Sequence, residues 1–294
     1  MSGRARPPRE LGPPLRALAW KGRPQKAIEA FPWNVPAVRA LDVLDLNAAV
    51  TFFVGENGSG KSTVLEAIAA SARLPTVGSA SVDHDPTLDQ QRALARMLRL
   101  TWAWKPVRGF YLRAEDFFGH LKQRARDDAR EQRERREARA AWAAPTDDAE
   151  DEADDDGARP WSPTDAPPMD SAHPDEIAAR EHLARHDARS HGESFMDLFQ
   201  QRVAGGGLYL LDEPEAPLSP QRQLSFLALM HDAVQEGAQF VVATHSPILL
   251  AYPGARIYGF DDAPVREVPY EELEHVRVTR DFLNAPERYL RHLL

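Results

Sequence analysis

The chain has 294 residues, 43% of them hydrophobic, which is enough apolar material for one large domain or for a domain with an inserted lobe. It contains no cysteine, which excludes disulfides and thiolate metal sites and fits a reducing compartment. No apolar run is long enough to span a membrane, so we expect a cytoplasmic protein with no membrane contact.

The net charge of −9 is distributed unevenly along the chain. Residues 141–176 contain twelve acids and one arginine, a net charge of −11, which leaves +2 for the rest. The folded part is therefore expected to be nearly neutral, and any surface for DNA would have to be a local patch.

The N-terminal half alternates short apolar stretches with helical patterns that surround one glycine-rich turn. In chain order we expect a flexible arm (1–14), short strands (15–20 and 38–46), a strand that enters the glycine turn (50–54), helices (64–70 and 90–100) and a strand (109–114).

The middle of the chain is highly charged. Residues 122–141 are rich in Arg, Glu and Ala without an apolar seam, which favours a solvated helix over an Arg-rich face that touches phosphates. Residues 144–174 carry the acidic run and many prolines, so we expect disorder there, with a Mg²⁺-buffering or partner-docking role as the alternative. We interpret 122–189 as an insert within a single domain that covers 15–294.

The C-terminal half again alternates helices and strands. We expect helices (176–189, 190–203 and 220–233), strands (208–211 and 239–244), a β-ribbon (257–260 with 265–268) and a terminal helix (281–294). Such alternation predicts an α/β fold with a mostly parallel sheet that is covered on both faces.

The glycine turn carries the pattern G-x-x-x-x-G-K-[ST] between a β-forming stretch and a helix. That context turns the pattern into a predicted phosphate site, because curled backbone N–H groups and a helix N-terminus point at one anion. Lys61 is expected to reach the β- and γ-phosphates of ATP, and the Ser62 hydroxyl to bind Mg²⁺. The predicted nucleotide-binding residues of this loop are Gly55, Glu56, Asn57, Gly58, Ser59, Gly60, Lys61, Ser62 and Thr63.

A second motif consists of four apolar residues followed by Asp212, Glu213 and Pro214. At the end of a strand, Asp212 is expected to hold Mg²⁺, directly or through water. Glu213 is expected to lie beside the γ-phosphate and to polarise the attacking water as general base.

Two further motifs follow the same logic. His245 ends an apolar strand, where an imidazole can orient the attacking water or contact the γ-phosphate. Ser190, Gly192 and Glu193 open a helix and are predicted to bind phosphate at its N-terminus, although Ser and Glu at this spacing also form a capping box.

Taken in order, GENGSGKST, SHGES, LLDEPE and ATHSP resemble the Walker A, signature, Walker B and switch-histidine motifs of ABC-type ATPases. The SHGES form, with THSPILLAYP and FYLRAEDFF, is similar to stand-alone bacterial ATPases of the ABC/AAA type. These are relatives of the RecF- and SMC-type repair ATPases. The resemblance implies a P-loop fold with a mostly parallel central sheet, an N-terminal antiparallel β part and a helical signature lobe.

The same resemblance implies a head-to-tail homodimer in which ATP on one Walker A loop is closed by the signature box of the other copy. The sequence departs from the family pattern at Pro217, where an alanine is usual, and the glutamine usually found in the Q-loop is not evident. Glu115 is our candidate for that role and for a third metal ligand.

The expected activity is Mg²⁺-dependent hydrolysis of ATP to ADP and phosphate. DNA repair or maintenance, or phage defence, is the expected role, with DNA and an effector protein as candidate partners. A transporter ATPase bound to a membrane permease and a non-hydrolysing switch gated by ATP are the alternatives.

Overall fold

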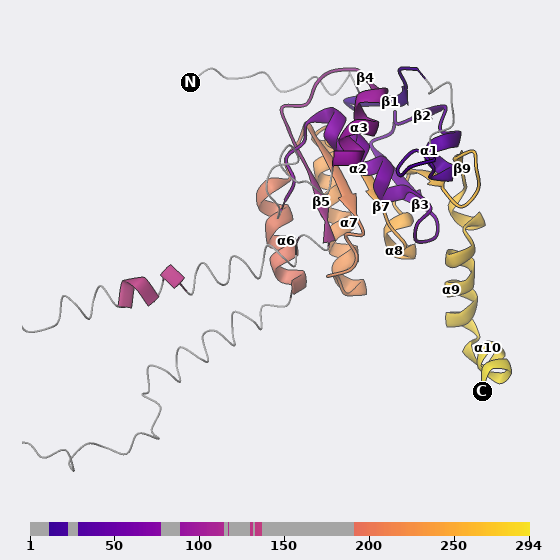
Figure 1. Ribbon diagram of the computed structural model, residues 1–294. Coiled ribbons are helices and arrows are strands. Elements are labelled where there is room, and N and C mark those ends of the chain that lie inside the picture. The colour runs from indigo at the N-terminus through magenta and orange to yellow at the C-terminus, as the bar shows by residue number, and fades with distance from the viewer. Residues whose placement is uncertain are drawn as a thin grey trace, which may run out of the picture. The chain divides into compact units, whose positions relative to one another are not determined.

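A six-stranded sheet, in the order β5-β6-β7-β3-β8-β9, forms the centre of the molecule (Figure 1). The computed structural model describes residues 12–22, 29–77, 89–114, 117, 130–131, 133–136 and 191–294. The strands are β3 (Val50–Val54), β5 (Arg108–Arg113), β6 (Gly207–Asp212), β7 (Gln239–Ala243), β8 (Arg256–Gly259) and β9 (Arg266–Glu267). All neighbours are parallel except β8 and β9, so the expected mostly parallel sheet is confirmed.

A second, antiparallel sheet has the order β2-β1-β4 and is built from β1 (Leu15–Trp20), β2 (Val43–Asp45) and β4 (Leu98–Trp102). The buried Gln239 side chain joins the two sheets. It accepts from the Leu15 N–H at 2.8 Å and donates to the carbonyls of Leu15 at 2.9 Å and Leu46 at 2.7 Å.

Helices cover both faces of the large sheet, because successive strand residues point to opposite sides. One core contains Phe53, Leu210 and Val241 with α2 (Lys61–Ala72) and α3 (Asp89–Met97). The other core contains Phe52, Leu211 and Val242. It packs against α6 (His191–Arg202), α7 (Pro220–Gln235) and α8 (Pro247–Leu250). The predicted three-layer α/β fold is thus confirmed.

Three expected boundaries are wrong. Residues 38–46 do not form one strand, since α1 (Pro36–Ala40) precedes β2 and Pro36 suits the first turn of a helix. The helix expected at 90–100 ends at Met97, because Leu98 and Leu100 pair with Trp20 and Leu18 of β1.

The terminal helix is likewise two helices, α9 (Glu274–Asn284) and α10 (Pro286–Leu293), with the short η4 (Tyr270–Glu272) before them. The break falls at Ala285, whose φ of −151° and ψ of 64° are not helical. A residue before proline is driven out of the helical region by contact with the ring, which explains the break at Pro286.

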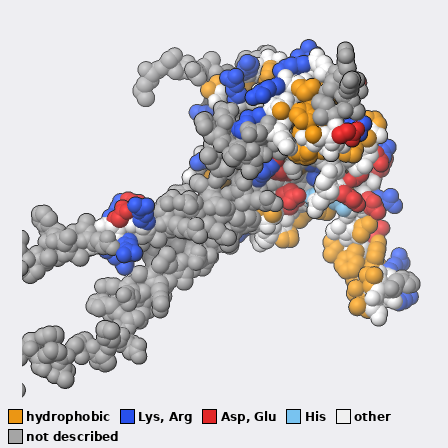
Figure 2. Space-filling view, viewed as in Figure 1, with side chains coloured by type: hydrophobic (Ala, Val, Ile, Leu, Met, Phe, Trp, Pro, Cys, Tyr) orange, Lys and Arg blue, Asp and Glu red, His pale blue; other side chains and the backbone are white. Residues whose placement is uncertain are grey.

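Helices α9 and α10 extend from the β8–β9 side of the sheet, and apolar side chains line α9 in the space-filling view (Figure 2). The exposed apolar residues of this arm include Val278, Phe282, Leu283, Leu290 and Leu293. Within the described ranges, no helix combines the length and apolar character needed to cross a membrane.

The chain divides into two units, Met1–Leu121 with His191–Leu294, and Lys122–Ser190. Of the charged helix expected at 122–141, residues 130–131 and 133–136 are described and helical. The acidic segment 144–174 and the helix expected at 176–189 lie outside the described residues, as do residues 1–11 of the N-terminal arm. The insert boundaries therefore stay a prediction.

Candidate functional site

The strand register brings the ends of four neighbouring strands to one edge of the sheet. Asp212 of β6 pairs with Ala243 of β7, and Ala243 pairs with Phe53 of β3. Val54 of β3 in turn pairs with Gly259 of β8. Since the strands are parallel, the segments that follow them leave the sheet together, which is where open α/β sheets bind ligands.

The glycine loop, residues 55–60, connects β3 to α2 as predicted. Gly55, Gly58 and Gly60 have φ values of 148°, 83° and 106°, in the region that only glycine adopts easily. A Cβ on Gly60 would lie 2.6 Å from Val35 Cγ1. The Glu56 N–H donates to Asp261 Oδ1 at 2.5 Å, so the residues after β8 hold the loop in place.

The Lys61 side chain is 4% exposed and folds back along this loop. Its Nζ donates to the carbonyls of Gly55 at 2.5 Å and Glu56 at 2.9 Å. Burial lowers the pKa of Lys61, whereas the carboxylates of Asp212 and Glu213 act in the opposite direction. The ammonium group of Lys61 therefore lies near the carboxylates of Asp212 and Glu213, at the carboxyl ends of the strands.

Asp212 is the buried acid of the site, with 8% of its surface exposed. Burial raises its pKa to about 6, while a hydrogen bond from Ser62 and the charges of Arg113 and Lys61 favour the carboxylate. Its Oδ1 has no hydrogen-bond partner among the described residues. A buried acceptor without a partner, beside a serine hydroxyl, fits the donor set of a Mg²⁺ site.

No group of three or more His, Cys, Asp or Glu that could cage a metal occurs in the described part of the chain. Mg²⁺ is usually bound by one or two carboxylates together with substrate phosphates. Ser62 and Asp212 would be the protein ligands here, and Glu115, the third candidate, lies outside the described residues.

Glu213 follows in a left-handed backbone conformation, with a φ of 52°. Its N–H donates to the Ala243 carbonyl at 2.9 Å, which extends the β6–β7 pairing by one residue. The side chain is exposed, so a carboxylate stands free at the edge next to the buried Asp212. A non-glycine residue in this region carries strain of the kind that often accompanies function.

The backbone N–H of His245 donates to Glu215 Oε1 at 2.7 Å, so the Glu215 side chain fixes the backbone at His245. The other oxygen, Glu215 Oε2, and His245 Nε2 are both buried without a partner in the described structure. Burial raises the pKa of Glu215. Sequence reasoning missed Glu215, because its role depends on how two loops meet.

Arg113 and Asp261 were also missed by sequence reasoning. Arg113 ends β5 opposite Asp212, forms an ion pair with the buried Glu66 of α2, and donates to the Tyr111 hydroxyl at 2.9 Å. Arg113 is the last residue of β5, and Asp261 follows the end of β8. A charged residue at or after the end of a predicted strand was the feature of the sequence that could have identified them.

At the signature box, Glu193 Oε1 accepts from Arg222 Nη2 at 2.8 Å, with side chains 52% and 29% exposed. A Cβ on Gly192 would lie 2.8 Å from the Pro217 carbonyl, so only glycine fits between α6 and the loop after β6. Ser190 lies outside the described residues, and helix α6 begins directly after it.

The remaining predicted loop residues lie between β3 and the first turn of α2. Asn57 is exposed, Thr63 is buried, and Ser59 Oγ is buried without a partner among the described residues. The structure thus brings the predicted Walker A, Walker B and switch-histidine residues to one edge.

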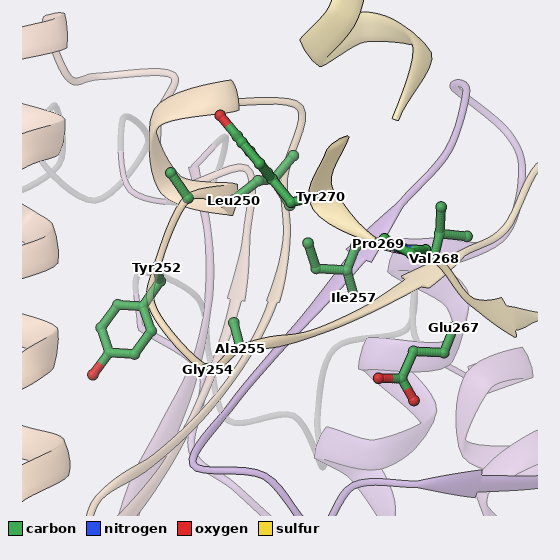
Figure 3. A pocket seen from close by; sticks show the side chains of 10 residues that line it. Leu250, Tyr252, Gly254, Ala255, Ile257, Glu267, Val268, Pro269 and Tyr270 are labelled. Atoms are coloured by element: carbon green, nitrogen blue, oxygen red, sulfur yellow. The ribbon is translucent and has the colours of Figure 1, made fainter. Parts of the chain in front are cut away.

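A separate pocket of about 570 Å³ opens near the amino end of β8 (Figure 3). Its lining includes Leu250, Tyr252, Ile257, Val268 and Tyr270. Because the glycine loop leaves the carboxyl ends of the parallel strands, this pocket belongs to the opposite edge and is not the predicted nucleotide site.

Two family comparisons match parts of the chain. Residues 34–73, which include the glycine loop, match a family described as "AAA domain". Residues 194–251, from α6 to the end of α8, match a family described as "AAA domain, putative AbiEii toxin, Type IV TA system". The comparison with curated proteins returned no match.

Solved structures of ATP-binding cassettes resemble the chain only loosely. A metal-chelate type ABC transporter in an inward-facing conformation is 14% identical, with 88% of this chain and 84% of that chain covered and a TM-score of 0.39. The ATP-binding cassette MJ0796, a dimer bound to ADP and Pi, is 16% identical, with 88% and 99% covered and a TM-score of 0.36.

Both matched segments carry parts of the sheet edge described above, the glycine loop in one and the residues after β6 and β7 in the other. Over these two segments, and in its mostly parallel sheet, the chain is similar to AAA domains, which supports a nucleotide-binding site at this edge.

Proposed function

We propose that the chain hydrolyses ATP to ADP and phosphate at the edge formed by the glycine loop, Asp212, Glu213 and His245. One observation carries the proposal: a cationic loop after β3 lies at the same edge as a buried acid and an exposed acid that follow β6, two strands away in the parallel sheet, and Oδ1 of the buried acid has no partner among the described residues. This is the arrangement that phosphoryl transfer needs, since its catalysis is mostly positioning and charge stabilisation.

Each residue has a distinct task in this proposal. Lys61 and the loop N–H groups neutralise charge on the phosphates, and Ser62 with Asp212 holds the metal. When bound, Mg²⁺ would supply positive charge that neutralises the phosphates. Glu213 accepts the proton of the attacking water, and His245 orients that water against the γ-phosphate.

The test of the base assignment is Glu213→Gln, which keeps the size of the side chain and removes its basicity. Turnover is expected to fall by about 100-fold or more, while ATP affinity changes little, because general-base catalysis contributes only in the transition state. Phosphate release and binding of a fluorescent ATP analogue measure the two quantities.

The control is Glu287→Gln, an exposed acid of α10, which should leave both quantities unchanged. Hydrolysis by Glu213→Gln at the wild-type rate would remove Glu213 from the base role. Wild-type turnover as low as that of Glu213→Gln, with intact ATP binding, would instead support the non-hydrolysing switch.

The proposal extends to assembly and place. We infer that the active form is a head-to-tail homodimer in the cytoplasm, in which Ser190, Gly192 and Glu193 of one copy close the ATP site of the other. The exposed carboxylate of Glu193 supports this, because a side chain at the surface can be shared with a second copy.

The biological role proposed is DNA maintenance or phage defence, with DNA or an effector protein as partner. The toxin–antitoxin wording of the family matched at 194–251 supports the defence alternative. ATPase rates with and without DNA ends separate the alternatives, because stimulation by ends indicates repair. Co-purification of a membrane permease would favour the transporter alternative.

A further inference from the structure

One glutamine side chain joins the loops that follow β6 and β7. Gln223 lies in the first turn of α7, and its Oε1 accepts a hydrogen bond from the Ser246 hydroxyl at 2.5 Å. Its Nε2 donates to the Leu218 carbonyl at 3.1 Å. Ser246 directly follows the predicted switch histidine, and Leu218 belongs to the loop that begins with Glu213. A single amide therefore spans the two loops that carry the proposed base and the residue proposed to orient the water.

The buried Ser246 is in turn fixed to the backbone around it. Its hydroxyl oxygen is the N-cap of α8 and accepts from the Leu249 N–H at 3.2 Å, a contact that stabilises the start of a helix. Its own N–H donates to Thr244 Oγ1 at 3.0 Å. Because His245 lies between Thr244 and Ser246, a displacement of the Ser246 side chain also moves the backbone at His245.

The preceding residue of the same turn contacts the signature box instead. Arg222 Nη2 donates to Glu193 Oε1 at 2.8 Å, and a Cβ on Gly192 would lie 2.5 Å from Arg222 Nη1. Successive residues of an α-helix point about 100° apart, so Arg222 and Gln223 face different neighbours. Accordingly, α7 contacts both α6 and α8 (Figure 1).

The first turn of α7 is a firm support for both side chains. Ser219 is its N-cap, and the Ser219 hydroxyl oxygen accepts from the Arg222 N–H at 3.4 Å. The Gln223 N–H donates to the Ser219 carbonyl at 2.9 Å. Pro220 occupies the first helical position, where its fixed φ suits the start of a helix. Both side chains thus reach their partners from a backbone with little freedom.

We propose that Arg222 and Gln223 are positioning residues for two different ATP sites. Gln223 positions His245 in the site of its own copy, and Arg222 positions the signature box that closes the site of a second copy. The inference rests on the proposed ATPase function and on its homodimer. In this assignment neither residue touches the nucleotide, and each acts through the group that it holds.

The first test replaces Gln223 with Met, which keeps the length of the side chain and removes both hydrogen bonds. The expected result is a kcat about 10-fold lower with KM for ATP changed less than about 2-fold, because a displaced His245 is felt in the transition state. Glu215 still accepts from the His245 N–H, so the loss stays partial. Gln221→Met, an exposed glutamine of the same turn, is the matched control and should match wild type.

Ser246→Ala, alone and combined with Gln223→Met, tests the hydrogen bond itself. If the bond positions His245, the double variant should have about the kcat of the weaker single variant, because the second change removes nothing further. Losses in kcat that multiply would overturn the role of Gln223. So would a loss that disappears once rates are divided by the folded fraction, measured by circular dichroism.

The second test assigns each residue to a site, in a mixed dimer of Lys61→Ala and Glu193→Arg protomers. Its one working site has the glycine loop of the Glu193→Arg copy and the signature box of the Lys61→Ala copy. Gln223→Met should lower phosphate release about 10-fold when added to the Glu193→Arg copy and have no effect in the other. Arg222→Met should do the reverse, with a loss of about 5-fold, since a partly exposed ion pair contributes modestly.

Equal losses from either copy would contradict the assignment of the two residues to different sites. A mixture that is inactive before either change is added would overturn the homodimer and the role of Arg222, while the result for Gln223 in the pure protein stands. Wild-type protein that does not hydrolyse ATP would overturn the proposed function and the inference with it. Normal turnover that Glu213→Gln abolishes, with Gln223→Met and Arg222→Met at the wild-type rate, would overturn the inference alone.

Discussion

At the scale of single residues, the ionised carboxylate of Asp212 lowers the stability of the metal-free protein, because it is buried. Its carboxyl is buried, and its pKa of about 6 lies above the ordinary 3.8. A pKa raised on folding means that the folded protein holds this proton more tightly than the unfolded chain. The group therefore destabilises the fold above pH 6, and this penalty disappears as the pH falls below 3.8.

Asp212→Asn is predicted to stabilise the metal-free protein at pH 7.5, by at most about 3 kcal/mol, because the amide cannot ionise. The gain should shrink through pH 6 to 4 and vanish near pH 4, and turnover should be lost. Denaturant unfolding at several pH values measures the difference.

Asp232→Asn, on the exposed side of α7, serves as the comparison and should show no such trend. An Asp212→Asn protein that is less stable than wild type at pH 7.5 would contradict this account of Asp212. So would a variant whose free energy of unfolding differs from that of wild type by the same amount at pH 7.5 and pH 4.

At the scale of elements, the pairing of distant strands determined where one predicted helix ends, which the local sequence pattern did not. The stretch 90–100 has helical periodicity throughout, yet Leu98 and Leu100 leave the helix to pair with β1. Strand pairing between residues so distant in the chain overrides local propensity, since it buries the side chains and satisfies the backbone groups together. Gln239 shows the same dependence, because its partners come from residues 15 and 46.

Gln239→Leu is predicted to lower the free energy of unfolding by about 3 kcal/mol, because it leaves buried backbone groups of Leu15 and Leu46 without partners. Chemical denaturation measures the loss. Gln235→Leu, exposed on α7, controls for the change of residue type and should shift stability by less than about 0.5 kcal/mol. Equal effects of the two changes would mean that the Gln239 hydrogen bonds do not join the sheets.

At the scale of the whole molecule, the proposed site needs two copies of the chain. If so, a Lys61→Ala protomer and a Glu193→Arg protomer, each inactive alone, should regain activity when mixed. One of the two sites in the mixed dimer then has an intact glycine loop and an intact signature box. Random pairing gives at most about a quarter of wild-type activity per chain.

Phosphate release by the mixture, against each variant alone, measures this complementation, and light scattering with ATP reports the dimer. A mixture as inactive as its components, with dimers still formed, would place the whole site within one chain. Thermal unfolding of Glu193→Arg checks that loss of the Arg222 ion pair has not unfolded α6.

The sequence by itself determined the fold class, the motif order and most strand positions. The reason is local: a glycine-rich turn, a lysine at a helix start and acids at a strand end each occupy only a few consecutive residues, so their patterns can be recognised in the sequence. The break at Pro286 was equally local, although the pattern of 281–294 was interpreted as one helix.

Only the tertiary structure decided which residues support the motifs. Arg113, Glu215 and Asp261 come from segments far apart in the chain, and the sequence patterns assigned none of them a role, although Arg113 and Glu215 lie within the stretches FYLRAEDFF and LLDEPE. Their roles follow from the register of the parallel strands and from the way in which the segments after those strands meet. These long-range contacts determine burial and pKa, and they show that the predicted edge is built from the ends of neighbouring strands.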